Sequence, residues 1–215
     1  TPDWTETERL AQEKTALGFY VSGHPFNAYA AELASLVRTR LADIEPRGER
    51  YLIAGVVTSV RTQVSRRGKM AFVTLDDGKS SVEIVVFNET FEAALNRLRE
   101  DCQVIADVKV TQRTSDDGEV QGLRVIVESV FDLAEARRRY ARRLALACNG
   151  NASGDKLQGI LAPFREGTVP VTVHYENNGV GGDFDLPDAW RVTLDDALID
   201  RLREWLSPSN VTIVY

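Results

Sequence analysis

The side chains that could do chemistry in this sequence gather between residues 61 and 87, where basic residues and phenylalanines stand close together. Guanidinium and ammonium groups bind phosphate, and aromatic rings stack on bases with about 1–3 kcal/mol per base. The pattern therefore predicts a surface that binds single-stranded nucleic acid, formed by Arg61, Arg66, Arg67, Lys69, Phe72 and Phe87.

The alternation of residues leaves open whether the two phenylalanines are exposed. Phe72 alternates with Met70 and Thr74, whereas Ala71 and Val73 take the other side of the same strand-like run. Because the side chains of a strand point alternately to its two faces, either face can be the buried one. Each phenylalanine is therefore either a stacking platform or a part of the core.

Residues with catalytic potential are few elsewhere in the sequence. The histidines His24 and His174 have no second ligand at metal-binding spacing, and His24 lies in a Gly-Pro turn sequence. Cys102 and Cys148 lie in apolar runs, which favours reduced core cysteines over a disulfide bond. We therefore expect no catalytic residue, no metal site and no cofactor.

Three pairs of adjacent aspartates raise the alternative of a Mg²⁺ site for phosphoryl transfer. Asp76–Asp77 and Asp116–Asp117 stand in turn sequences, where aspartate side chains accept backbone N–H groups. Asp195–Asp196 precedes an amphipathic run, and acids favour the start of a helix. These local roles predict turn interactions and a favourable interaction with a helix dipole instead of metal binding.

The composition is that of a folded protein, since 43% of the 215 residues are hydrophobic and 27% are charged. No apolar run approaches the roughly 20 residues that cross a bilayer. The first residues are polar and acidic, so we expect no signal peptide, no membrane partner and a cytoplasmic location. The sequence begins with threonine, which suggests a segment of a longer protein.

Positive charge is local in this chain, whose formal net charge is −6. It is concentrated between residues 61 and 69 and in an expected helix over 133–147, whereas residues 148–215 are acidic. Exposed charges act over about a Debye length, roughly 8–10 Å, so local clusters can bind phosphate on an acidic protein. The basic face of this helix contains Arg137, Arg138, Arg139, Arg142 and Arg143. It is either simply solvated, or it contacts nucleic acid or an acidic partner through Arg138, Arg139 and Arg142.

The elements that must position these residues begin with two helices, expected over 4–17 and 28–38 and capped by Thr5 and Asn27. Residues 52–133 then read as three strands, a helix over 88–100 capped by Asn88, and two further strands. Gly55 in the first strand marks a bend or bulge. Five strands with a helix after the third predict an OB-fold β-barrel, with an open antiparallel sandwich as the alternative.

The last third predicts a small α/β unit of split βαββαβ order. We expect a short strand near 144–150, a helix over 152–164 capped by Ser153, and a strand over 167–176 placed at an edge by Pro170. A glycine-rich loop then leads to a strand over 190–194, a helix and a final strand. The expected fold class is thus mixed, with a helical segment over 1–48, an OB-fold domain over 49–132, a basic linker helix over 133–147 and an α/β protein-docking domain over 148–215.

Several of these stretches resemble a known family. The sequences "LGFYVSGHP", "RRGKMAFVTLDD" and "EGTVPVTVHY" are similar to those of the C-terminal region of the alpha subunit of bacterial DNA polymerase III, a replicative polymerase, and the likeness runs through the whole chain. The full-length subunits are DNA-directed DNA polymerases. The resemblance implies that the polymerase carboxylates and the internal sliding-clamp motif lie upstream of this chain, which itself would not be an enzyme.

The resemblance further implies that the OB domain lies near single-stranded template, and that the last domain binds the tau subunit of the clamp loader. We expect weak DNA contact at the basic hairpin. The alternative is a purely structural interaction module without DNA binding, and a hydrolase is disfavoured by the lack of a catalytic constellation. Our candidates for the tau contact are the apolar residues near the end of the chain, Trp205, Val211, Ile213 and Tyr215.

Overall fold

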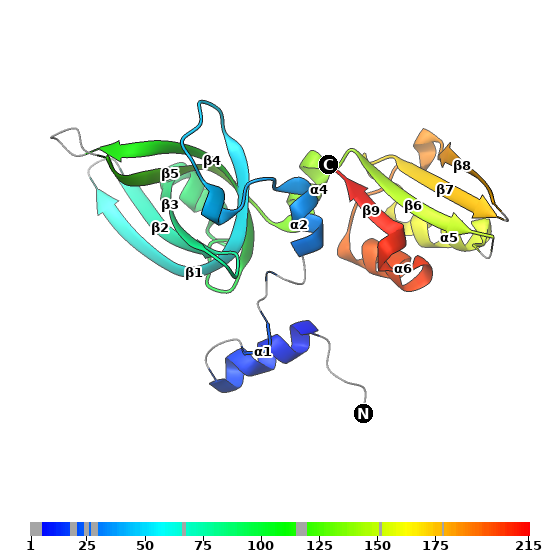
Figure 1. Ribbon diagram of the computed structural model, residues 1–215, viewed down its shortest axis with the longest axis horizontal. Helices are drawn as coiled ribbons and strands as arrows, with labels where there is room; N and C mark the ends of the chain where they lie inside the picture. Colours follow the sequence, from blue (N-terminus) through cyan, green and yellow to red (C-terminus); the bar gives the residue numbers. More distant parts are fainter. Residues whose placement is uncertain are drawn as a thin grey trace. The chain divides into compact units, whose positions relative to one another are not determined.

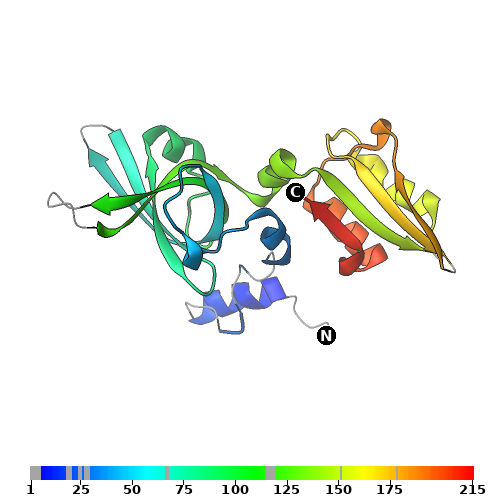
Figure 2. The same ribbon diagram turned by 45° about the horizontal axis from the view of Figure 1, so that its top comes forward.

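The computed structural model describes residues 6–17, 21–23, 26, 30–65, 68–114, 120–150, 152–177 and 179–215. The chain divides into two compact units, 1–133 and 134–215 (Figures 1 and 2). In chain order the main elements are α1 (Glu6–Leu17), α2 (Ala30–Leu36), β1 (Tyr51–Ser65), β2 (Gly68–Asp76), β3 (Ser81–Phe87), α3 (Asn88–Ala94), β4 (Gln103–Thr114), β5 (Val120–Phe131), α4 (Leu133–Tyr140), β6 (Arg143–Asn149), α5 (Gly154–Leu161), β7 (Val171–Asn177), β8 (Val180–Asp185), α6 (Asp196–Leu206) and β9 (Val211–Val214).

The first unit contains a closed five-stranded barrel in the order β1-β2-β3-β5-β4. Figure 2 shows its strands wrapping around a common interior. Neighbouring strands run antiparallel except β3 and β5, which pair in parallel. The expected OB-fold arrangement is confirmed, with α3 between the third and fourth strands.

The strand β1 bends so that it can pair with two neighbours. Its pairing with β2 shifts register between Val57 and Ser59, so the bulge lies there and not at Gly55 as expected. Gly55 has a different role, because a Cβ atom at this position would lie 3.0 Å from the Leu75 Cβ and 3.1 Å from the Asp76 carbonyl oxygen. Glycine thus permits a close approach of β1 to β2.

The barrel core is filled from alternate positions of its strands and closed by the segment that follows β3. Phe91, Ala94 and Leu98 are almost completely buried against the strand side chains. The helix expected over 88–100 is shorter, because α3 ends at Ala94 and turns follow. Phe87, and not Asn88, occupies the N-cap position, without a side-chain hydrogen bond.

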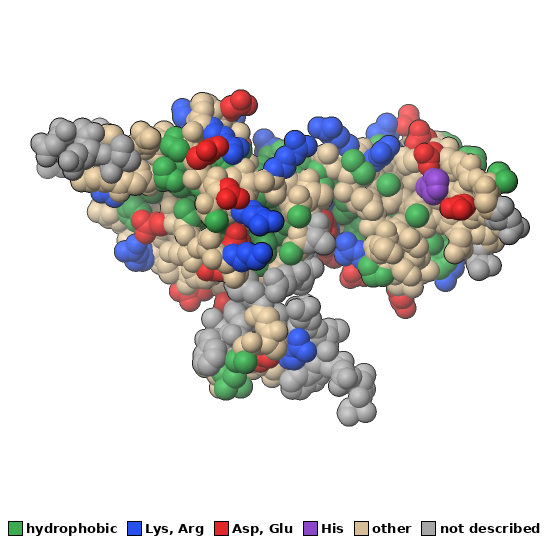
Figure 3. Space-filling view, viewed as in Figure 1, with side chains coloured by type: hydrophobic (Ala, Val, Ile, Leu, Met, Phe, Trp, Pro, Cys, Tyr) green, Lys and Arg blue, Asp and Glu red, His purple; other side chains and the backbone are tan. Residues whose placement is uncertain are grey.

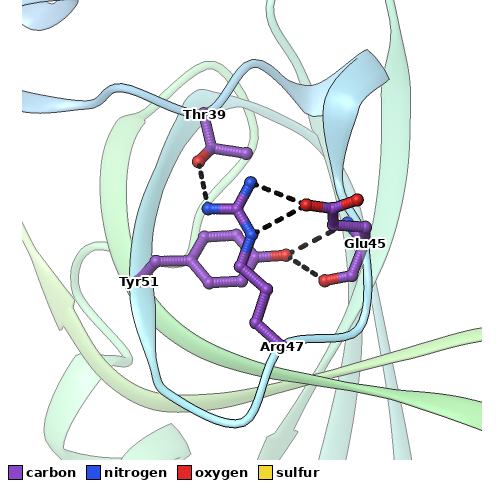
Figure 4. A network of polar contacts seen from close by, with 4 residues as sticks. All are labelled: Thr39, Glu45, Arg47 and Tyr51. Atoms are coloured by element: carbon purple, nitrogen blue, oxygen red, sulfur yellow. Dashed lines mark hydrogen bonds and ion pairs between the residues drawn. The ribbon is translucent and has the colours of Figure 1, made fainter.

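A polar network fixes the chain that leads into β1 (Figure 4). The Arg47 guanidinium lies 3.0 Å from a Glu45 carboxylate oxygen and 4.7 Å from the centroid of the Tyr51 ring. The Tyr51 hydroxyl donates to the Glu45 carbonyl at 2.8 Å, and Thr39 accepts from Arg47 at 3.5 Å. The network holds the start of β1 against the preceding segment by hydrogen bonds and a cation–π contact.

The carboxylate of Glu13 in the first helix, α1, binds the chain that follows the helix. The expected caps Thr5 and Asn27, and His24, lie outside the described residues. The Glu13 carboxylate of α1 accepts the N–H groups of Val21 and Ser22 at 2.8 and 2.9 Å. Hydrogen bonding by the side chain and backbone of Ser22, and then by Val21, lowers the pKa of Glu13. Within the described ranges, none of the helices combines the length and the apolar character that crossing a membrane requires.

The terminal unit is an open four-stranded sheet in the order β8-β7-β6-β9. Figure 1 shows α5 behind this sheet, and the buried side chains of α5 and α6 lie in one cluster with those of the strands. The βαββαβ order of elements is as expected. The strands β6 and β7 pair in parallel as direct neighbours, so no strand is inserted between them as in a split arrangement.

The predicted cap at Ser153 is confirmed, and the structure shows a second cap at Asp195, which the sequence placed only at the start of a helix. The Ser153 hydroxyl accepts the Lys156 N–H at 3.4 Å, and the Asp195 carboxylate accepts the Ala197 N–H at 2.8 Å. Each side chain satisfies a backbone donor that the first helical turn leaves unpaired.

Three other expectations for this unit are wrong. The helix over 133–147 ends at Tyr140, because Leu144, Leu146 and Cys148 alternate inward in β6 between β7 and β9. The glycine-rich stretch forms the strand β8, whereas 190–194 contributes only a bridge between Val169 and Val192. The strand β7 lies inside the sheet and not at an edge, since Pro170 precedes its first residue.

An arginine is buried in the terminal unit. Arg137 of α4 is 1% exposed, and its guanidinium donates to the carboxylate of Asp196 at the start of α6. The Asp196 side chain remains 69% exposed. Arg137 therefore ties α4 to α6 within the terminal unit and does not belong to a basic surface.

The variant Asp196→Asn removes the carboxylate charge that faces Arg137. We expect the free energy of unfolding of the terminal unit to fall by about 1–2 kcal/mol, less than for a fully buried pair, because water screens the exposed carboxylate. Urea denaturation followed by tryptophan fluorescence measures this loss, since Trp190 and Trp205 both lie in this unit. Asp200→Asn on the same helix is the control. An equal loss in both variants would contradict a stabilising ion pair.

Candidate nucleic-acid interface

The side chains of β2 alternate between the interior and the outer face of the barrel. Ala71, Val73 and Leu75 are fully buried, whereas Met70 and Phe72 on the other side of the strand are half-buried. Phe72 lies opposite Arg61 of β1 and opposite Val85 of β3. The question left open by the sequence is thereby answered for Phe72, which lies on the outer face of β1, β2 and β3.

Phe87 lies on the same outer face, opposite Met70, and is 36% exposed. The guanidinium carbon of Arg124 on β5 lies 5.8 Å from the centroid of its ring. This is within the range of a cation–π interaction, which leaves the N–H groups of the guanidinium able to bind phosphate.

A groove of about 510 Å³ runs over this face. Phe72, Met70 and Val85 contribute its apolar part, and Arg113 and Arg124 contribute cations from β4 and β5. Neither arginine makes an ion pair with another described residue. Sequence reasoning missed both, although the alternation in "KVTQRT" and "GLRVIV" places them on the side away from the buried valines.

Arg61 belongs to the face but is already paired. Its guanidinium forms an ion pair with the carboxylate of Glu83 on β3, and Glu83 also lines the groove. A phosphate would have to compete with this carboxylate, although both side chains are well exposed and water weakens the pair. Figure 3 shows basic and acidic side chains mixed over the visible described surface, so the local arrangement decides what binds.

Three of the expected phosphate-binding residues belong to the stretch between β1 and the start of β2. Arg66 and Arg67 lie outside the described residues, as does the acidic stretch 115–119, which contains Asp116 and Asp117. Lys69 is exposed but takes the opposite side of β2 from Phe72, and its Nζ atom lies 5.1 Å from the centroid of the Phe91 ring. The structure therefore does not bring Lys69 together with the aromatic face.

The aspartates of the β2–β3 turn have the local role that their sequence predicts. The Asp76 carboxylate accepts the Gly78 N–H at 2.6 Å, and the Asp77 carboxylate accepts from Lys79 and Ser80 at 2.9 and 2.8 Å. These bonds close the turn and leave the carboxylates occupied by backbone donors.

The candidate residues of the terminal unit fall into two groups. Val211 and Ile213 are each 6% exposed and belong to the core, so they are not available to a partner. Trp205 and Tyr215 are half-buried at the margin of the same core. Within the expected basic cluster, Arg138 and Arg139 are exposed on α4, whereas Arg142 is exposed beyond the end of the helix.

Comparisons with known proteins cover both units. Residues 51–133 match the family described as an OB-fold nucleic acid binding domain, and residues 156–206 match the C-terminal domain of DNA polymerase III subunit alpha. The mitochondrial single-stranded DNA binding protein of S. cerevisiae is 19% identical, covers 42% of this chain and 97% of its own, and has a TM-score of 0.31, too low for a further argument.

Relatives of the same name extend along the whole chain. The DNA polymerase III alpha subunit of Neisseria meningitidis is 37% identical over 99% of this chain, and that of Pseudomonas aeruginosa is 33% identical over 98%. The chain spans 18% of the length of each relative. The chain therefore belongs to the DNA polymerase III alpha subunit family and joins an OB-fold nucleic acid binding domain to that subunit's C-terminal domain.

Proposed function

We propose that the barrel contacts single-stranded template DNA during chromosomal replication, and that the terminal unit binds the tau subunit of the clamp loader. The observation that carries the first part is the groove, which is lined by the half-buried ring of Phe72 on β2 and by Arg113 and Arg124 on β4 and β5. A stacking surface beside cations is what a single strand needs, because its bases are unpaired and its phosphates are charged.

The expected mode of binding is weak and dependent on salt. Phosphate contacts would come from Arg113 and Arg124, from Arg61 when it is released from Glu83, and from the expected tip residues Arg66 and Arg67. Because the acid Glu83 lies in the same groove, the net attraction for a phosphate chain is small. A purely structural module that binds no DNA is the second candidate, and the Arg61–Glu83 pair is the observation that favours it.

The double variant Arg113→Gln with Arg124→Gln tests the cations of the groove. Fluorescence anisotropy with a labelled single strand of about 16 nucleotides, the upper site size of one OB fold, gives the affinity at several salt concentrations. A plot of the logarithm of the association constant against the logarithm of the salt concentration has a negative slope. We expect this slope to become shallower by about 0.7 for each lost phosphate contact. Lys156→Gln with Arg201→Gln in the terminal unit removes the same charge and should leave the slope unchanged. No binding by the unaltered chain at low salt would favour the structural module.

The variant Phe72→Ala tests stacking separately from charge. We expect the affinity for the same oligonucleotide to fall by about 1–3 kcal/mol, with an unchanged salt slope, because a ring and no cation is removed. Phe184→Ala, at an exposed phenylalanine of the terminal unit, is the matched control. If the Phe72→Ala variant and the unaltered chain bind the oligonucleotide with equal affinity, and their circular dichroism is the same, the DNA does not stack on Phe72.

The proposed tau contact rests on the family of the terminal unit and on the partly exposed aromatic residues at its margin. We expect Trp205→Ala to weaken binding to purified tau by more than about 1 kcal/mol, as aromatic interface residues commonly do, and Tyr215→Ala to act in the same direction. Surface plasmon resonance measures both. Trp190→Ala is the control, since Trp190 is likewise half-buried against the core of this unit. Losses of equal size at Trp190 and Trp205 would point to destabilisation and not to a contact.

A further inference from the structure

The strand β8 leaves backbone groups without a partner strand at one edge of the terminal sheet. It is the outermost strand, and among the described residues it pairs with β7 alone. The Leu186 N–H donates to the Val171 carbonyl at 2.9 Å, and in an antiparallel pair the bonded positions alternate. The N–H and C=O groups of Gly181, Asp183 and Asp185 therefore point away from β7, where an added strand would lie.

The side chains of β8 differ between its two faces. Phe184 is 57% exposed and Val180 is 77% exposed, and both lie on the face that the sheet turns toward its helices. Asp183 and Asp185 lie on the opposite face, beside His174 and Thr172 of β7, and both are exposed. An added strand would thus meet an apolar row on one side and an acidic row on the other.

The acidic row is held in place by the neighbouring strand. The Asp183 carboxylate lies 2.7 Å from Nδ1 of His174, and the Asp185 carboxylate accepts the Thr172 hydroxyl at 2.7 Å. Each of these contacts uses one carboxylate oxygen and leaves the other oxygen for a cation. Figure 3 shows acidic side chains beside the histidine on this surface.

The negative charge of Asp183 and Asp185 at the outer edge of β8 favours one kind of added strand over another. A second copy of β8 pairing with the first would set aspartates against aspartates, and like charges on neighbouring strands are destabilising. The strand has no lysine, proline or bulge of the kind that blocks edge pairing in many proteins. The edge is therefore closed to a copy of itself and open to a strand of opposite charge.

We propose that the outer edge of β8 is a docking site for an extended segment of another protein that alternates basic and apolar residues. The segment adds to the sheet as a fifth strand, with main-chain hydrogen bonds to Gly181, Asp183 and Asp185. Its basic side chains face the two carboxylates, and its apolar side chains cover Phe184 and Val180. The proposal goes beyond the tau contact proposed above and does not depend on it, since that contact involves other residues.

The test uses the whole 215-residue chain and a defined probe. The probe is a labelled, end-blocked peptide of about six residues, the usual strand length, that alternates lysine and valine. We expect saturable binding in fluorescence anisotropy, together with slower amide exchange by NMR at Gly181, Asp183 and Asp185. The amides of Gly182 and Phe184 already face β7 and should not change.

Two matched controls separate strand addition from simple charge attraction. Asp183→Asn with Asp185→Asn should weaken peptide binding about tenfold, whereas Asp200→Asn with Glu204→Gln on α6 removes the same charge and should not. Methylation of alternate peptide nitrogens keeps the charge of the probe and should abolish binding, because it blocks the main-chain bonds. The proposal is overturned if the lysine–valine peptide does not bind, if a glutamate–valine peptide binds equally well, if the three amides stay unprotected, or if β8 instead joins two copies of the chain.

Discussion

The first unit depends on a single strand that has to pair with two neighbours. The strand β1 pairs with β4 from Tyr51 to Val56 and with β2 from Val56 to Ser65, and this change of partner closes the barrel. Two local features allow it. At Gly55 the absence of a side chain lets β2 come close, and the bulge after Val57 turns the strand toward its second neighbour. The backbone of Val57 remains hydrogen-bonded at the bulge. Its N–H donates to the Cys102 carbonyl at 2.9 Å, and its carbonyl accepts the Asp101 N–H at 2.8 Å. A side chain at Gly55 would push β2 away at the point where closure is made.

Closure also decides what the proposed interface contains. Once Ala71, Val73 and Leu75 fill the interior, Met70 and Phe72 have to face outward, because the period of a strand is two. The same constraint turns Lys69 away from the aromatic face, although it is close to Phe72 in sequence. The cations in the groove with Phe72 come instead from β5, which the barrel pairs with β3, and from β4, which pairs with β5. A basic stretch of sequence is therefore a poor guide to a basic surface, whereas the strand pairing gives the neighbours directly.

The order of elements and several local interactions could be predicted from the sequence, because they depend on near neighbours. The caps at Ser153 and Asp195 and the turn bonds of Asp76 and Asp77 are of this kind. Features that depend on segments distant in the sequence could not be predicted. The residues of β6 favour a helix, but burial between β7 and β9 makes them a strand, and the ion pair with Asp196 places Arg137 in the interior. The cations of the groove belong to this second class, since their position depends on which strands meet.

The two units differ in how they can bind a partner. In the closed barrel every strand has two neighbours, so the backbone offers no free edge and a ligand must use outward side chains or loops. The terminal sheet is open and ends at β8 and β9, so its backbone can bind another strand directly. The edge at β9 is the weaker candidate, because this strand has only four residues. The edge at β8 is longer, and its aspartates oppose pairing between copies. Side-chain recognition of a flexible charged polymer thus suits the first unit, and main-chain recognition of an extended protein segment suits the second.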